Sequence, residues 1–152
     1  MKIITLFIGI AILASCGNSK NSTTNNEATN TEKEATPQAK QAILSQDIAK
    51  FKDSESYSIL DVNLQGNVLQ LDISYSGGCE EHNFELVGSA FIMKSSPPKR
   101  IIKLYHHKNE DNCRELIFET LYFDISKLAY HSGEIILQIE QFKQKAISYT
   151  KK

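Results

Sequence analysis

Residues 68–75, "VLQLDISY", carry an apolar side chain at every second position from Leu69 to Tyr75. Because successive side chains of a β-strand point to opposite faces of the sheet, this pattern predicts a strand that buries one face. Residues 56–64, "SYSILDVNL", show a similar alternation, and "QGN" at residues 65–67 separates the two runs. A short connection that contains glycine favours a β-hairpin, so we expect two antiparallel strands here.

Similar runs continue to the end of the chain. They lie at residues 82–87, 90–93, 100–107, 113–125, 134–142 and 146–150. Seven or eight short strands with turn signals between them predict an all-β fold, an antiparallel β-sandwich of the immunoglobulin-like kind. Before these strands, residues 41–52, "QAILSQDIAKFK", place Leu44, Ile48 and Phe51 at helical spacing. That spacing predicts a short N-terminal helix packed on the sandwich.

The first residues of the chain have the composition of an export signal. Lys2 is a short basic flank, an apolar run extends from Ile3 to Leu13, and small residues precede Cys16. We therefore predict that residues 1–15 are a signal peptide. The apolar run is shorter than the ~20 residues that a membrane-spanning helix needs, so we expect no transmembrane anchor.

The residues from Leu13 to Cys16, "LASC", resemble the lipobox of bacterial lipoproteins. This resemblance implies cleavage before Cys16 and acylation of its thiol and amine by long chains such as palmitate. Gly17 and Asn18 are not the Asp associated with inner-membrane retention, so the resemblance implies the outer membrane, with the protein facing the periplasm or the cell surface. The alternative is an ordinary signal peptide in which Cys16 is incidental.

The segment after Cys16 has little to bury. Residues 17–40 contain no Val, Ile, Leu, Met, Phe, Trp or Tyr. We therefore predict that the lipidated cysteine and a disordered linker occupy residues 16–40 and that the β-sandwich domain occupies residues 41–152. The chain has 17 basic and 18 acidic residues without a basic stripe, so we expect no nucleic-acid partner.

Two cysteines, Cys79 and Cys113, fall in the predicted domain. An even number of cysteines in an exported domain favours a structural disulfide between them. Closing a loop of about 35 residues would stabilise the fold by roughly 4 kcal/mol in the chain-entropy account. A disulfide is therefore our first interpretation of this pair.

The second interpretation is a metal site. Cys79 is followed by His82, and a downstream "YHHKNEDNC" supplies His106, His107 and Cys113. Two sulfurs with one or more imidazoles suit zinc or copper. The alternative function is accordingly a metal-binding lipoprotein whose ligands are Cys79, His82, His106 or His107, and Cys113.

The third interpretation is a nucleophilic cysteine with a histidine as its base. The carboxylates of Glu80 and Glu81, directly after Cys79, disfavour the thiolate that such a nucleophile needs. The chain also has no GxSxG, HExxH or phosphate-loop motif. We therefore expect no enzymatic activity, no catalytic residue, no resident metal and no cofactor.

A second resemblance covers roughly residues 55–140. The matching positions are His82, Leu104, His107, Asp111 and the "FDIS" at residues 123–126. They are similar to motifs of small lipoproteins of Gram-negative anaerobes, in particular the NigD-like proteins with a C-terminal β-sandwich. The resemblance implies a fold and an exported location, and it implies no activity.

The expected function is therefore binding or an accessory role in the envelope. The membrane is reached through the lipid anchor, and the partner of the domain is expected to be an envelope protein or a glycan. The larger aromatic side chains are expected in the core. They are Tyr75, Phe84, Phe91, Phe118 and Phe123. An exposed member of this group would indicate a binding face.

Overall fold

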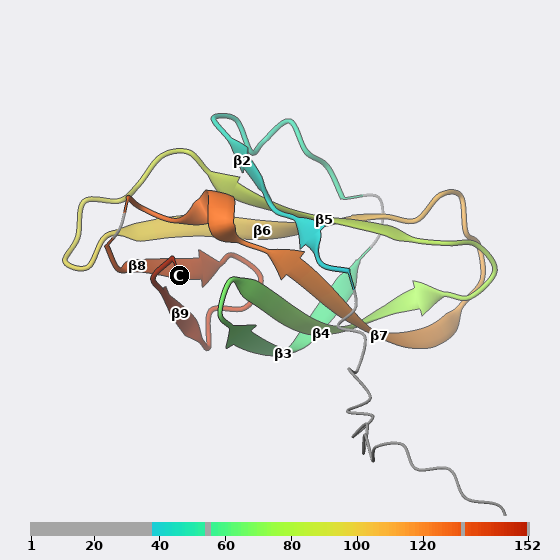
Figure 1. The fold of residues 1–152 in the computed structure, drawn as a ribbon. Helices are drawn as coiled ribbons and strands as arrows, with labels where there is room; N and C mark the ends of the chain where they lie inside the picture. The colour runs from blue at the N-terminus through green and yellow to red at the C-terminus, as the bar shows by residue number, and fades with distance from the viewer. Residues whose placement is uncertain (1–37, 54–55, 132, 152) are drawn as a thin grey trace, which may run out of the picture. The chain divides into compact units, whose positions relative to one another are not determined.

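The computed structural model describes residues 38–53, 56–131 and 133–151 and folds them into two β-sheets (Figure 1). The four-stranded sheet has the order β1 (Lys40–Gln41), β7 (Glu115–Asp124), β4 (Val68–Gly77) and β3 (Tyr57–Gln65). The five-stranded sheet has the order β2 (Ile43–Ser45), β5 (Asn83–Ser89), β6 (Lys99–His107), β8 (Ile135–Ile139) and β9 (Ala146–Tyr149). A short 3₁₀-helix, η1 (Ser126–Leu128), follows β7. The predicted signal peptide, Cys16 and the predicted linker up to residue 37 lie outside the described residues.

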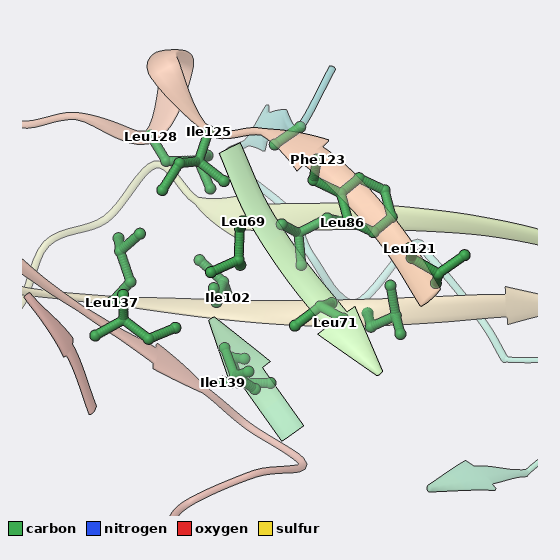
Figure 2. Close-up of a cluster of buried hydrophobic side chains, with 14 of the residues drawn as sticks. Leu69, Leu71, Leu86, Ile102, Leu121, Phe123, Ile125, Leu128, Leu137 and Ile139 are labelled. Carbon is green, nitrogen blue, oxygen red and sulfur yellow. The ribbon is translucent and has the colours of Figure 1, made fainter. Parts of the chain in front are cut away.

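The core lies between the two sheets, as a β-sandwich requires. Figure 2 shows Leu69 and Leu71 of β4 packed with Leu86 of β5 and Ile102 of β6, and all four side chains are fully buried. The alternation from Leu69 to Tyr75 therefore does what the sequence predicts, because the odd-numbered positions face inward. Burying each of these aliphatic side chains stabilises the fold by about 1.5–3 kcal/mol.

Strand direction differs from the prediction of a purely antiparallel sandwich. Both sheets are mixed, with parallel pairs β1–β7, β2–β5 and β6–β8. Parallel neighbours in one sheet need a crossover connection. After β6 the chain crosses to β7 in the other sheet and returns through η1 to β8, which then runs beside β6 in the same direction.

The predicted helix at residues 41–52 is wrong. The chain is extended over residues 40–45, where it pairs first with β7 as β1 and then with β5 as β2 and changes sheets at the fully buried Ala42. In this extended form, the segment supplies hydrogen-bond partners to backbone groups at the margins of β5 and β7. A helix would leave those groups without these partners. Bends and a turn follow at residues 46–50. Phe51 of the helical pattern still packs on the sandwich, since its ring lies 5.2 Å from that of Tyr105 on β6.

Residues 90–93 also depart from the prediction, because they form no strand. Met93 makes only an isolated bridge with Lys99 on the far side of the two prolines. In the ranges that the structure covers, no helix has the length and apolar character needed to cross a membrane.

Two loops at one end of the sandwich connect the sheets. One joins β4 to β5 through residues 78–82, and the other joins β6 to β7 through residues 108–114. The pairing of Gly77 with Glu115 in one sheet and of Asn83 with His107 in the other brings these loops side by side. They lie at the right-hand end of the sandwich in Figure 1. Residues far apart in sequence thus meet there.

Candidate functional site

The two inter-sheet loops are joined by a disulfide between Cys79 and Cys113. Their Cα atoms lie 5.8 Å apart across a sequence separation of 34 residues. Cys79 is exposed and Cys113 is half-buried, so solvent reaches the bond. The structure thus agrees with the first interpretation of the cysteines, and the sulfur of Cys79 is not a thiolate in this state.

Asp111 holds both cysteine loops in place. Its Oδ2 accepts hydrogen bonds from the backbone N–H groups of Cys79 and Glu80, each at 3.0 Å, and its Oδ1 accepts one from Cys113 N–H at 2.7 Å. These donors, with the Glu80 amide contributing most, hold the pKa of the Asp111 carboxyl well below its ordinary value. Asp111 is buried and ionised, and its charge is satisfied by backbone amides.

His82 extends this network inward. Its Nε2 lies 3.2 Å from Asp111 Oδ2, and its Nδ1 lies 2.7 Å from His106 Nε2. Because an ionised carboxylate only accepts hydrogen bonds, Nε2 of His82 carries the proton. In neutral His82 the Nδ1 atom is then an acceptor, and His106 Nε2 donates to it.

Aromatic rings enclose the two histidines. Tyr75 stacks on His82 with ring centroids 4.6 Å apart, and Phe84 stacks on His106 at 4.4 Å with an interplanar angle of 7°. Tyr75 also donates to Glu119 Oε2 at 2.9 Å, and burial, with this hydrogen bond, raises the pKa of Tyr75 to about 12. Both histidines are therefore packed among aromatic rings at the edge of the hydrophobic core.

Gly77 explains why the sequence has glycines before Cys79. A Cβ on Gly77 would lie 2.8 Å from the Cε1 and Nε2 atoms of His82, so only glycine allows the imidazole to approach. Gly78 has a φ of +114°, a conformation that favours glycine. The two neighbouring glycines thus serve different purposes, close approach and chain reversal.

Of the predicted metal ligands, the structure brings the two cysteines together with Asp111, and none of the predicted histidines belongs to that cluster. Ligand atoms of Cys79, Asp111 and Cys113 lie within 4.8 Å of one another. His82 contacts Asp111, and His106 lies behind His82. His107 is directed elsewhere, since its Nε2 lies 3.3 Å from Glu85 Oε2 on the outer side of the five-stranded sheet.

The pattern of cysteines and histidines did not indicate a role for Asp111, although the NigD-like resemblance includes its position. A local signal was present, because an Asp two residues before another residue often accepts that residue's backbone N–H. The hydrogen bond from Cys113 N–H is of this kind. The contacts to Cys79 and Glu80, by contrast, depend on the packing of the two loops.

A polar pocket of about 360 Å³ lies beside the disulfide. It is lined by Ser76, Lys108, Asp111, Asn112, Cys113 and Arg114. A second and larger hollow of about 490 Å³ is lined by Ile92, Met93, Lys94, Ser95, Pro98 and Tyr130, away from these cysteines. The first pocket gives solvent and small solutes access to one side of the disulfide region.

The aromatic residues predicted to be core divide between the interior and the surface. Phe84 and Phe123 are buried and Tyr75 is half-buried, whereas Phe91 is 72% exposed and Phe118 is 68% exposed. The prediction for Phe91 and Phe118 is therefore wrong. Phe118 pairs with Ser74 of β4 and shares the outer face of the four-stranded sheet with Leu116, which is 62% exposed.

No protein-family model matches this chain, and neither does any curated protein sequence. Solved structures share its fold. A NigD-like immunity protein from Bacteroides caccae superposes with a TM-score of 0.51 at 16% identity, covering 73% of this chain and 58% of that one. A toxin-related protein from Parabacteroides distasonis, described as putative, gives a TM-score of 0.50 at 13% identity, covering 74% and 61%. The match thus spans less than two thirds of each of those proteins, and the likeness establishes the NigD-like β fold.

Proposed function

We propose that this protein is a lipoprotein, anchored through acyl chains on Cys16, whose β-sandwich is a non-enzymatic binding domain on the periplasmic side of the outer membrane. The observation that carries the proposal is the lipobox-like "LASC" at residues 13–16, placed directly after a short apolar run. Several acyl chains anchor a protein stably, because each buried methylene contributes about 0.8 kcal/mol.

The exposed disulfide supports export. Disulfides persist in oxidising compartments and are reduced in the cytosol of most bacteria. The Cys79–Cys113 bond is open to solvent at Cys79, so burial does not protect it from reductants. A stable bond of this kind is therefore best explained by folding outside the cytosol.

The outer face of the four-stranded sheet supports a binding function. Phe118 and Leu116 of β7 lie there beside Ser74 and Ser76 of β4. Large apolar side chains on a flat sheet face lose contact with water when a partner covers them. We infer that the partner is an envelope protein, because the proposed lipid anchor would hold this face within the cell envelope.

Acylation is tested with the full chain produced in a Gram-negative host fed an alkyne-bearing palmitate. We expect the label on the wild type and on the Cys79→Ser/Cys113→Ser double variant, together with sedimentation in the outer-membrane fraction. The Cys16→Ser variant should lose both the label and the membrane association. Labelling that survives Cys16→Ser would overturn the anchor.

Binding at the sheet face is tested by photo-crosslinking in the cells that naturally produce the protein. A photoreactive amino acid at position 118 should give a defined adduct, and the same group at Ser148, exposed on β9, is the matched control. Leu116→Glu should abolish the adduct, because it places a charge in the contact. Adducts that form equally well at position 148, or that persist with Leu116→Glu, would count against this face.

A further inference from the structure

We propose that reduction of the Cys79–Cys113 disulfide converts this structural link into a zinc site, with the two cysteine sulfurs and the Asp111 carboxylate as protein ligands and water as the fourth. This inference goes beyond the proposed anchoring and binding, and it does not depend on them. It also replaces the histidine-containing ligand set expected from the sequence.

The donor atoms are already close together. The two sulfurs and a carboxylate oxygen of Asp111 lie within 4.8 Å of one another while the disulfide is intact. Zinc binds thiolate sulfur at about 2.3 Å and carboxylate oxygen at about 2.0–2.2 Å, so tetrahedral ligands around one ion lie about 3.5–4 Å apart. Modest separation of the sulfurs after reduction therefore produces the required spacing.

The backbone around the site does not depend on the disulfide for its position. Asp111 binds the N–H groups of Cys79, Glu80 and Cys113, and Asn109 Nδ2 donates to Glu81 O at 2.7 Å. These hydrogen bonds connect the same two loops as the S–S bond. The reduced loops consequently stay near each other, and zinc would bind two preorganised thiols.

The Asp111 carboxylate can accept a metal in addition to its present donors. Among the described residues, its Oδ1 accepts the N–H of Cys113, whereas Oδ2 accepts two amides and the Nε2–H of His82. A carboxylate oxygen has about two lone pairs, so Oδ1 retains one for an ion. His82 would then act as the hydrogen-bonding support of a metal-ligating carboxylate, a common arrangement in zinc sites.

The site is open to solvent, and charges of both signs surround it. Cys79 is exposed to a reductant, and the pocket of about 360 Å³ lined by Asp111 and Cys113 has room for an ion with bound water. The two loops and the start of β7 carry more acidic than basic residues. The acidic ones are Glu80, Glu81, Glu110, Asp111 and Glu115, and the basic ones are Lys108 and Arg114. The two basic residues line the pocket itself, whereas the four glutamates are exposed outside it, so the excess of negative charge lies on the loops around the pocket.

The chemistry of the switch balances with a dithiol as the reductant. The dithiol gives two electrons and two protons to the S–S bond and becomes a cyclic disulfide, while Cys79 and Cys113 become thiols. Zn²⁺ then displaces the two thiol protons, which leave to solvent, and two Zn–S bonds form. Zn²⁺ and the two thiolates balance in charge, so the product with the ionised Asp111 carboxylate and a water ligand carries one negative charge.

The test uses the full chain in a Cys16→Ser background, so that only Cys79 and Cys113 supply thiols. Zinc affinity is measured by competition with a chromophoric chelator, and Co²⁺ serves as a spectroscopic probe of thiolate ligation. We expect one metal ion per chain after reduction and none before it, with a thiolate-to-cobalt band in the near ultraviolet. Circular dichroism should show that the reduced, metal-bound chain keeps its β-structure.

Three substitutions locate the site. Cys79→Ser and Cys113→Ser should each remove the thiolate band, and Asp111→Asn should weaken zinc binding about 10- to 100-fold. His107→Asn is the matched control and should leave the affinity unchanged, because His107 faces Glu85.

Several results would overturn the proposal. They are the absence of metal binding after reduction, equal binding by the oxidised chain, one ion shared by two chains, and binding by a chain that has lost its β-structure. Unchanged affinity in Asp111→Asn would remove Asp111 from the ligand set. None of these outcomes bears on acylation of Cys16. If the zinc site is disproved, the proposed lipid anchor is unaffected and is decided by the labelling experiment.

Discussion

Asp111 shows how one side chain can organise two loops. It accepts hydrogen bonds from three backbone N–H groups, which come from both sides of the disulfide, and His82 adds a fourth donor. Hydrogen bonds to a charged group are stronger than neutral ones, and in a buried position they are costly to lose. The cysteines are therefore placed by Asp111 as well as by their own bond.

Asp111→Asn should destabilise the protein, because an amide NH₂ would face donors that a carboxylate oxygen now accepts. The folded-state pKa lies well below the ordinary value of about 3.9, so the ionised carboxylate stabilises the fold fully above that value. As pH falls below about 4, the stability difference between wild type and variant should shrink steadily. Urea unfolding from pH 2.5 to 7 measures it.

Asp61→Asn is the control for this comparison, since Asp61 is exposed and only 3.7 Å from Lys145 Nζ. Its difference from wild type should stay small throughout, as is usual for surface ion pairs. A difference for Asp111→Asn that does not change between pH 7 and pH 2.5 would contradict a stabilising role for the charge.

His82→Ala should cost about 3 kcal/mol or more of unfolding free energy. The change removes one of the donors to Asp111, the hydrogen bond between His82 and His106, and a ring stacked on Tyr75. His107→Ala, which removes only a half-exposed contact with Glu85, should cost less than about 1 kcal/mol. Denaturant unfolding of both variants measures the two losses of unfolding free energy. Similar losses for the two variants would argue against a stabilising role for the hydrogen bond between His82 and His106.

Successive side chains of β7 point alternately into the core and toward the proposed binding face. Phe123 pairs with the buried Leu69 and points into the core, whereas Phe118 pairs with Ser74 and points outward. The two phenylalanines lie five positions apart, so they fall on opposite faces of the strand. The sequence pattern of β7 is apolar on both sides, and it therefore does not distinguish them.

Phe123→Ala should cost about 3–5 kcal/mol, as for other large-to-small changes in a core. Phe118→Ala should change the unfolding free energy by no more than about 0.5 kcal/mol, as is usual at the surface. Thermal or chemical unfolding measures both. A large loss for Phe118→Ala would mean that this face is covered within the chain.

At the scale of the whole molecule, the described residues are held together by contacts between two mixed sheets, and the disulfide adds to them at one end. Its 34-residue separation encloses two neighbouring strands of the five-stranded sheet, because β5 and β6 lie between the cysteines in sequence. The core contains residues from both sheets and does not include the cysteines. The fold should consequently survive without the bond.

Reduction in the Cys16→Ser background, without added metal, should lower the unfolding free energy by about 2–4 kcal/mol while the far-ultraviolet circular dichroism stays that of a β-protein. The loss arises mainly because the unfolded chain regains the freedom of a loop of about 35 residues. The Cys79→Ser/Cys113→Ser variant should behave like the reduced chain. Complete unfolding on reduction would contradict the holding role of Asp111.

The all-β class and the positions of most strands could be predicted, because alternation such as that from Leu69 to Tyr75 is local and each strand carries its own. The pairing of Cys79 with Cys113 was also within reach, since the domain has only two cysteines. The strand directions could not be predicted, because β6 and β8 become parallel neighbours only after the chain has passed through the other sheet. The helix predicted from the spacing of Leu44, Ile48 and Phe51 does not form, because part of this segment pairs with strands far away in the sequence.

The sequence by itself determined which residues alternate, where the turns fall and which sulfurs are available. Only the tertiary structure decided that Asp111 binds both cysteine loops, that His82 and His106 share a hydrogen bond, and that Phe118 faces outward. The physical reason is that alternation records two faces of a strand without saying which one another sheet covers. Contacts between loops depend on the register of strands far apart in the chain.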